Sequence, residues 1–208
     1  MKLYYIRHGQ TEQNIRHIIQ GQTHGKLSKE GKKQADLLGR RLKDEKFDII
    51  YASDLERASD TARSIHHYQP HTPISFTSEL RERNFGEYNG KPSDDAQIGW
   101  GKHTNILEHQ NYLFPPGGET LPAMQKRAQK FLKKILSGHP NQTVAIVSHG
   151  TFGRAFLAAI RRTKVEKLYH LRLHNASISI FEITIPSTKN SPGKFHYKTI
   201  AFNDISHL

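Results

Sequence analysis

Residues 143–150 have the sequence Thr-Val-Ala-Ile-Val-Ser-His-Gly, an unbroken β-prone run that ends in a histidine and a glycine. A continuous apolar run of this kind is typical of a strand in the middle of a parallel sheet. Residues 3–9, Leu-Tyr-Tyr-Ile-Arg-His-Gly, repeat the same design near the N-terminus. The two stretches predict buried strands that present His8 and His149 at one edge of the sheet, where α/β proteins bind their ligands.

Strands and helices alternate along the rest of the chain. Apolar residues at helical spacing predict helices over residues 28–46, with Ser28 as the N-cap, and over 55–67, 119–137 and 152–161. Short β-prone runs predict further strands over residues 47–52, 73–76, 177–185 and 195–202. This alternation predicts an α/β fold, a three-layer α/β/α sandwich with a mostly parallel central sheet. Residues 77–116 are rich in Gly and Pro, and we expect an irregular excursion that covers the substrate.

The composition narrows the class of protein. The chain has 208 residues without a break in composition, which predicts one domain over residues 1–208. It contains no cysteine, which excludes disulfides and thiolate metal sites and fits a reducing cytoplasm, where we expect the protein. The N-terminal apolar stretch is broken at Arg7, so we expect neither a signal peptide nor a membrane span.

The charge of the chain predicts an anionic partner. Thirty-one Lys and Arg against 19 Asp and Glu give a net charge of +12, which attracts anions of any kind. The basic residues are interleaved with apolar ones along the predicted helices, which is typical of solvated helix faces, and no nucleic-acid-binding motif is present. We therefore expect a small phosphorylated metabolite as partner, without nucleic acid or membrane. The oligomeric state, monomer or homodimer, stays open.

Two arginines are further candidate site residues beside the two histidines. Arg7 directly precedes His8, and Arg57 begins the helix after the strand at 47–52, so both could give forked donors to a phosphate. Each residue also has an ordinary structural interpretation, since a lone histidine is more often a core or loop residue and Arg57 could form an ion pair on a helix face.

The order of these motifs resembles the histidine phosphatase superfamily, in its phosphoglycerate mutase-like branch of small broad-specificity and α-ribazole-phosphatase-type phosphatases. The matching blocks span nearly the whole chain: Arg7-His8-Gly9-Gln10-Thr11 with Asn14, Gln20-Gly21, Leu27-Ser28 with Gly31, Ser53-Asp54-Leu55-Glu56-Arg57-Ala58 with Thr61-Ala62, Leu80-Arg81-Glu82 with Phe85-Gly86 and Gly90, Pro116-Gly117-Gly118-Glu119, Ser148-His149-Gly150, and Asn203-Asp204 with His207-Leu208.

The resemblance implies a role for each matching residue. It implies that His8 is the nucleophile that becomes phosphohistidine, that Arg7, Arg57 and His149 surround the phosphoryl group, and that Glu82 is the proton donor. It also implies that Asn14, Gln20 and Gly21 bind phosphate or substrate. Thr151, which follows the second His-Gly, could add a hydroxyl or amide donor there. These roles agree with the chemistry, because a neutral imidazole attacks phosphorus and cationic donors stabilise the equatorial oxygens without a metal or other cofactor. The cluster of His66, His67 and His71 lacks a carboxylate and is interpreted as a surface cluster, so no metal site is expected.

The resemblance implies a metal-independent phosphatase acting on phosphate monoesters of small metabolites. A cofactor-dependent phosphoglycerate mutase is the first alternative, but mutases of the family carry a longer insertion after the glutamate and a different motif in place of residues 83–88. A non-catalytic basic protein that binds polyanions is the second. His24 and Lys26 depart from the family pattern and predict extra positive potential near the entrance, while specificity is expected to depend mainly on residues 89–114.

Overall fold

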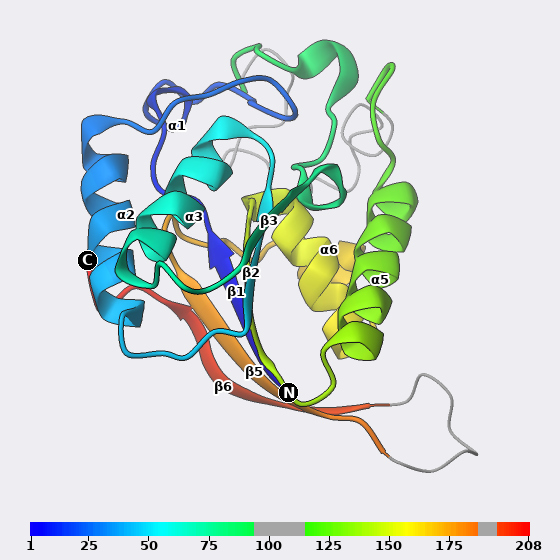
Figure 1. Ribbon diagram of the computed structural model, residues 1–208. Coiled ribbons are helices and arrows are strands. Elements are labelled where there is room, and N and C mark those ends of the chain that lie inside the picture. Colours follow the sequence, from blue (N-terminus) through cyan, green and yellow to red (C-terminus); the bar gives the residue numbers. More distant parts are fainter. Residues whose placement is uncertain (94–114, 187–194) are drawn as a thin grey trace.

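A six-stranded sheet forms the centre of the molecule (Figure 1). The computed structural model describes residues 1–93, 115–186 and 195–208, so residues 94–114 of the expected excursion lie outside the described residues. The strands are β1 (Lys2–Arg7), β2 (Ile49–Ser53), β3 (Ile74–Thr77), β4 (Thr143–Ser148), β5 (Ile178–Thr184) and β6 (His196–Asp204). They lie in the order β3-β2-β4-β1-β5-β6, with β1 to β4 mutually parallel and β5 and β6 added in antiparallel pairing.

Helices cover both faces of this sheet. The helices α2 (Lys29–Leu42) and α3 (Glu56–Tyr68) lie on one side, and α5 (Leu121–Gly138) and α6 (Gly150–Arg161) on the other (Figure 1). Each pair packs its apolar stripe on the sheet, so that two hydrophobic layers sandwich the strands. The predicted three-layer α/β class with a mostly parallel sheet is confirmed. No helix in the described parts of the chain is long and apolar enough to cross a membrane.

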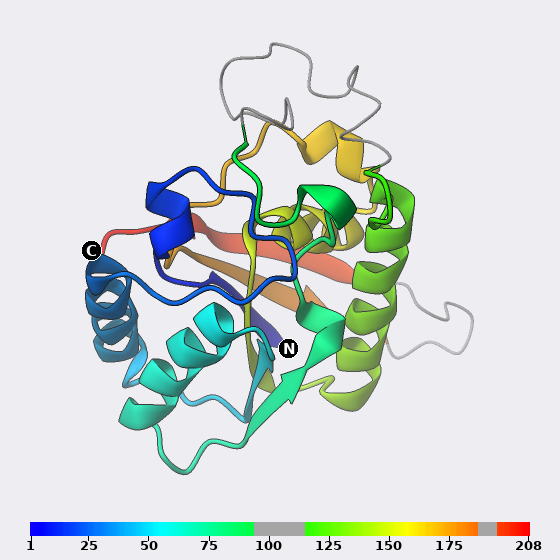
Figure 2. The ribbon, with the colours of Figure 1, turned by 90° about the horizontal axis from the view of Figure 1, so that it is seen from above.

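Irregular segments gather at the carboxyl ends of the parallel strands. The short helix α1 (Glu12–Ile15), which the sequence pattern did not predict, and η2 (Gly86–Tyr88) lie above this edge of the sheet (Figures 1 and 2). Two further short helices, η1 (Ser78–Leu80) and η4 (Val165–Leu168), were also not predicted. One turn of helix carries too few apolar positions to show a period, so such elements escape pattern analysis.

Candidate active site

The pairing of β1 with β4 brings the two histidines together. Arg7 lies opposite Ser148 in the parallel register, and the amide of His8 donates to the carbonyl of Ser148 at 3.0 Å. The next residue on each strand is a histidine, and the two imidazole rings meet edge to face with their centroids 5.2 Å apart. Adjacent parallel strands in matching register therefore place His8 beside His149, as the repeated strand pattern predicts.

The ring of His8 is held in one tautomer. Its Nδ1 lies 2.7 Å from the carbonyl oxygen of Gly9, which only accepts hydrogen bonds, so Nδ1 carries the proton and Nε2 keeps its lone pair. The backbone is fixed as well, because the carbonyl of His8 accepts from the amide of Ala176 and from the side chain of Asn175, each at 3.1 Å. His8 is 3% exposed, and burial together with the charges of Arg57 and Arg7 holds its pKa well below the usual value. The imidazole is therefore neutral and presents Nε2 for reaction.

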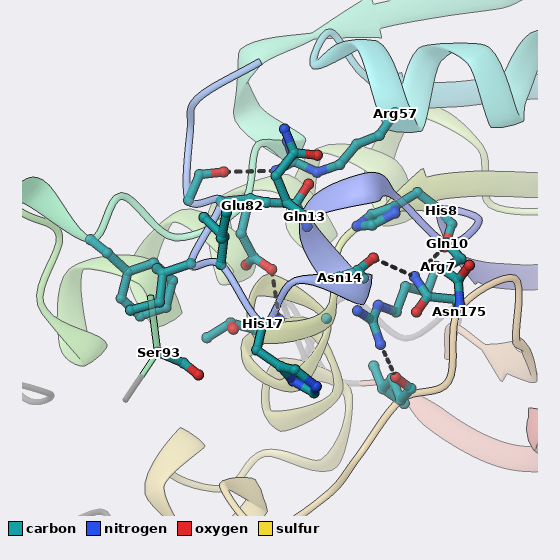
Figure 3. Close-up of a pocket in the computed structure, with 18 of the residues that line it drawn as sticks. Arg7, His8, Gln10, Gln13, Asn14, His17, Arg57, Glu82, Ser93 and Asn175 are labelled. Atoms are coloured by element: carbon teal, nitrogen blue, oxygen red, sulfur yellow. Dashed lines mark hydrogen bonds between the residues drawn. The ribbon is translucent and has the colours of Figure 1, made fainter. Parts of the chain in front are cut away.

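A cavity of about 330 Å³ opens at this edge of the sheet (Figure 3). Its lining includes eight of the nine side chains and loop positions that the sequence singles out, namely Arg7, His8, Asn14, Gln20, Gly21, Arg57, Glu82 and Thr151. His149 is the exception, since it is fully buried and does not line the cavity. The structure thus gathers the predicted set at one place but puts the second histidine behind it.

His149 contacts the cavity through Arg57. Its Nδ1 accepts from Nε of Arg57 at 3.2 Å, and its Nε2 lies 2.8 Å from the hydroxyl of Ser53. Burial and the neighbouring charges of Arg57 and His8 hold the pKa of His149 well below its usual value. A neutral His149 with Nδ1 as acceptor fixes the plane of the Arg57 guanidinium. The resemblance implies that His149 surrounds the phosphoryl group, whereas in the structure it contacts the cavity through Arg57.

Arg57 keeps donors available after its structural bonds are made. Besides Nε, which contacts His149, its two terminal nitrogens donate to the carbonyls of Gly21 at 2.7 Å and Thr23 at 3.0 Å. A guanidinium has five N–H donors, so two remain for a ligand. Burial lowers the pKa of Arg57 to about 10, and the same holds for Arg7. Both are therefore cationic at neutral pH.

Arg7 is placed by its neighbours on two sides. It donates through a terminal nitrogen to the carbonyl of Leu173, and its guanidinium lies against Gly150 at the start of α6. A Cβ added at Gly150 would lie 3.3 Å from Nε and 3.4 Å from Cζ of Arg7, which is tighter than ordinary contact. The glycine that follows His149 therefore gives Arg7 the room it needs.

Glu82 lines the same cavity, and its side chain lies against the N-terminus of α6. Its Oε1 accepts from the amides of Phe152 at 2.7 Å and Arg83 at 2.8 Å, and its Oε2 accepts from the amide of Thr151 at 3.0 Å. Three backbone donors, two of them at the start of α6, therefore hold the carboxyl group of Glu82 in one orientation. The backbone of Glu82 is also held, because its carbonyl accepts from Gln22 at 3.0 Å.

The predicted binding residues take different positions around the cavity. Asn14 caps α1 in a capping box with Thr11, and its Oδ1 also accepts from Asn175 at 3.2 Å. The Oε1 of Gln20 is buried and has no hydrogen-bond partner within the described residues. Gly21 adopts φ +48°, and its carbonyl holds Arg57. The amide of Thr151 is already used by Glu82, so only its hydroxyl remains for the donor role that the sequence suggested.

His24 and Lys26, which we expected near the entrance, do not line the cavity itself. Both line a hollow beside α1 together with the carboxylates of Glu12 and Glu56, and Gln13 lies in the lining of both the hollow and the cavity. Arg57 holds this loop through the carbonyls of Gly21 and Thr23. The additional positive charge at the cavity comes instead from Arg154 and Arg172.

Asn175, Arg154 and Arg172 are among the lining residues that escaped the sequence analysis. Asn175 donates to the carbonyls of His8 and Gly9 and to the side chain of Asn14, at 3.1 to 3.2 Å. It precedes β5, whose antiparallel pairing next to β1 is not visible in the sequence. Arg154 had a detectable signal, since it lies one helical turn beyond Gly150 and therefore on the same face of α6. Arg172 lies in an irregular segment that offered none.

The two buried neutral histidines make stability depend on pH. An unfolded histidine has a pKa of about 6.5. Because the folded values lie below it, the unfolded chain binds more protons at acidic pH, so the contribution to stability is present above pH 6.5 and lost as pH falls. Each histidine contributes a slope of up to about 1.4 kcal/mol per pH unit. Urea unfolding between pH 7 and pH 5 should show this loss, with a smaller slope in His149→Asn.

The exposed His71 provides the control for that measurement. His71→Asn should reproduce the wild-type slope. An equal slope in His149→Asn and the wild type would contradict a neutral, buried His149.

Gly31 sets the position of the loop that carries His8. In the first turn of α2, a Cβ at this glycine would lie 1.8 Å from the carbonyl oxygen of Gln10, which is backbone and must move. Gly31→Ala should therefore shift residues 9 and 10, lower kcat/KM at least about tenfold and cost about 1–3 kcal/mol of stability. Gly138→Ala is the control, since nothing lies within 4 Å of its added Cβ. Equal kinetics for both variants would contradict the close packing of α2 on the loop.

No group of three or more His, Asp or Glu side chains within the described residues could hold a metal ion. His66, His67 and His71 form no such cluster there. The described lining of the cavity offers the imidazoles of His8 and His17, the carboxyl group of Glu82 and several guanidinium groups.

Comparisons with known proteins agree with this arrangement. The family model of the histidine phosphatase superfamily (branch 1) matches residues 3–188. A protein of Bartonella bacilliformis named 2,3-bisphosphoglycerate-dependent phosphoglycerate mutase is 33% identical over 89% of this chain and 94% of its own length. The uncharacterized phosphatase PhoE of Bacillus subtilis is 34% identical over 85% of this chain and 86% of its own length.

Among solved structures, the phosphoserine phosphatase of Entamoeba histolytica, in complex with 3-phosphoglyceric acid, superimposes with a TM-score of 0.81 at 26% identity. The match covers all of this chain and 98% of that one. The sheet order, the paired histidines and the family model over most of the chain lead to one conclusion. This protein is an enzyme of branch 1 of the histidine phosphatase superfamily.

Proposed function

We propose that this chain is a metal-independent phosphoric monoester hydrolase that acts on small phosphorylated metabolites through a phosphohistidine on His8. The observation that carries the proposal is the state of His8: its Nδ1–H is bound to Gly9, which leaves Nε2 with its lone pair, and His8 lines the cavity together with Arg7, Arg57 and Glu82.

In the first step, Nε2 of His8 attacks the phosphorus atom and the bond to the ester oxygen breaks. The hydrogen bond from Nδ1 to Gly9 stabilises the positive charge that develops on the ring. Arg7 and Arg57 offer donors to the equatorial oxygens, where charge accumulates. Glu82, in its protonated form, gives its proton to the departing alkoxide.

In the second step, water attacks the phosphorus and the phosphorus–nitrogen bond breaks. Glu82 is now ionised and takes a proton from the water, so the enzyme returns to its starting state. The same carboxylate serves both displacements because both reacting oxygens occupy the same side of the phosphoryl group.

The second candidate function is a phosphoglycerate mutase, in which the phosphoryl group returns to a bound acid instead of to water. The Bartonella relative bears that name and covers nearly the same length, so chain length does not separate this protein from mutases as the sequence argument assumed. We prefer hydrolysis because residues 83–88 have the sequence Arg-Asn-Phe-Gly-Glu-Tyr, where the resemblance gives mutases a different motif.

A substrate panel tests the proposal. The wild type and His8→Ala are incubated in EDTA with several phosphate monoesters, and phosphate release is measured. 3-Phosphoglycerate is included, with and without 2,3-bisphosphoglycerate. Release that depends on His8 and exceeds isomerisation to 2-phosphoglycerate supports the phosphatase. Faster isomerisation that responds to the bisphosphate would favour the mutase, and no release from any ester would contradict hydrolysis.

A further inference from the structure

The described residues that line the cavity carry more positive charge than one phosphate group requires. Among them, four guanidinium groups, from Arg7, Arg57, Arg154 and Arg172, accompany one carboxylate, that of Glu82. A bound phosphate monoester with two negative charges balances only part of this set. We propose that Arg172, supported by Arg154, forms a second anion subsite that selects substrates with a second anionic group beside the phosphate. This inference rests on the proposed function and names the class of substrate.

The backbone around Arg172 is fixed by side chains. Three consecutive carbonyls each accept a hydrogen bond: Leu171 from Nε of Arg154 at 2.6 Å, Arg172 from Nδ2 of Asn203 at 3.0 Å, and Leu173 from Arg7. The Oδ1 of Asn203 also accepts from the amide of His174, at 2.8 Å. Because these three carbonyls are hydrogen-bonded, the irregular segment keeps one backbone conformation. The exposed side chain of Arg172 is therefore attached to a fixed backbone position at the cavity wall.

Arg154 extends this subsite into the protein. It is 3% exposed, its guanidinium lies 4.9 Å from the centre of the Tyr169 ring, and it lines the cavity. A guanidinium buried to this degree keeps its charge in a region that water does not screen. It therefore raises the local positive potential in which Arg172 would bind an anion.

The subsite is separate from the phosphoryl position. The carbonyls of Leu171 and Leu173, on either side of Arg172, accept from Arg154 and Arg7. Arg57 is held by other partners, namely His149 and the carbonyls of Gly21 and Thr23. A ligand that spans the cavity would place its phosphate near Arg57 and its second anion near Arg172.

Matched substrate pairs test the inference. Phosphoserine and phosphoethanolamine differ only by a carboxylate. 3-Phosphoglycerate has a carboxylate where glycerol 3-phosphate has a hydroxymethyl group. Fructose 1,6-bisphosphate and fructose 6-phosphate differ by a phosphate. In the wild type, kcat/KM should favour the more anionic member of at least one pair about tenfold or more, mainly through KM, as expected for one charge-assisted pair. The favoured pair shows whether the second anion is a carboxylate or a phosphate.

Substitution of Arg172 should remove that preference. In Arg172→Gln the ratio of kcat/KM within the favoured pair should fall about tenfold, and Arg172→Lys should retain part of it, since a lysine keeps the charge without the fork. Arg16→Gln removes the same charge from an exposed site on the C-cap of α1, outside the cavity, and should leave the ratio unchanged.

The outcomes separate this inference from the proposed function. Phosphate release without preference in any pair, or a preference that Arg172→Gln does not reduce, would overturn the subsite while the phosphatase stands. Absence of His8-dependent release from every ester would contradict the phosphatase itself.

Discussion

Replacement of His8 by alanine should reduce phosphate release by about 10³-fold or more, with KM little changed, since the nucleophile acts only in the chemical steps. The neighbouring His149 does not offer a substitute. His149 is fully buried, and both of its ring nitrogens already contact Arg57 and Ser53. The measurement is steady-state phosphate release from the best ester of the panel. His71→Ala, at an exposed position, controls for the loss of an imidazole.

The folded state of His8→Ala needs an independent check. His8 is buried, and its ring packs against His149, so truncation leaves a small hole and costs stability. Urea unfolding and circular dichroism will show whether the variant folds. A folded His8→Ala that releases phosphate at the wild-type rate would exclude His8 as nucleophile.

Glu82→Gln should have the second largest effect, a loss of about 10²- to 10⁴-fold in kcat/KM for alkyl phosphates. A glutamine keeps the size of the side chain and can accept from Phe152 and Arg83, but it gives no proton. Its amide nitrogen would face the amide of Thr151, which donates to Oε2 in the wild type. We therefore expect a cost in stability of about 1–3 kcal/mol as well.

The leaving group separates the catalytic role of Glu82 from its structural one. p-Nitrophenolate departs without a proton, so Glu82→Gln should form the phosphoenzyme from p-nitrophenyl phosphate at nearly the wild-type rate and then hydrolyse it slowly. A burst of p-nitrophenol in rapid mixing is the expected signature. Glu87→Gln, exposed and outside the cavity, should behave as the wild type. Equal losses for alkyl and p-nitrophenyl esters in the first turnover would indicate a merely structural residue.

The sequence predicted the layers of the fold because each long element carries its own periodic signal. The apolar runs that became β1 and β4 and the capped, amphipathic pattern that became α2 are local features of this kind. The pairing of β5 beside β1 depends on contacts between distant segments, so no local pattern predicted that Asn175 would donate to the backbone carbonyl of His8.

The candidate site was predictable where residues follow strands or helices in matching motifs. His8 and Arg57 are such residues, and the structure brings them to one cavity. Prediction failed for loops whose path depends on distant side chains. His24 and Lys26 line the neighbouring hollow and not the cavity itself, in a loop that Arg57 holds by two carbonyls. Arg172 lies in a segment held by Arg7, Arg154 and Asn203.

Direct trapping of the phosphoenzyme tests the central claim most directly. Glu82→Gln is mixed with p-nitrophenyl phosphate, quenched in alkali, which preserves phosphohistidine, and analysed by peptide mass spectrometry and phosphorus NMR. We predict one phosphoryl group per chain on Nε2 of His8, because Nδ1 is bound to the carbonyl of Gly9. A phosphoryl group on another residue, on Nδ1, or on none while phosphate is still released would contradict the account.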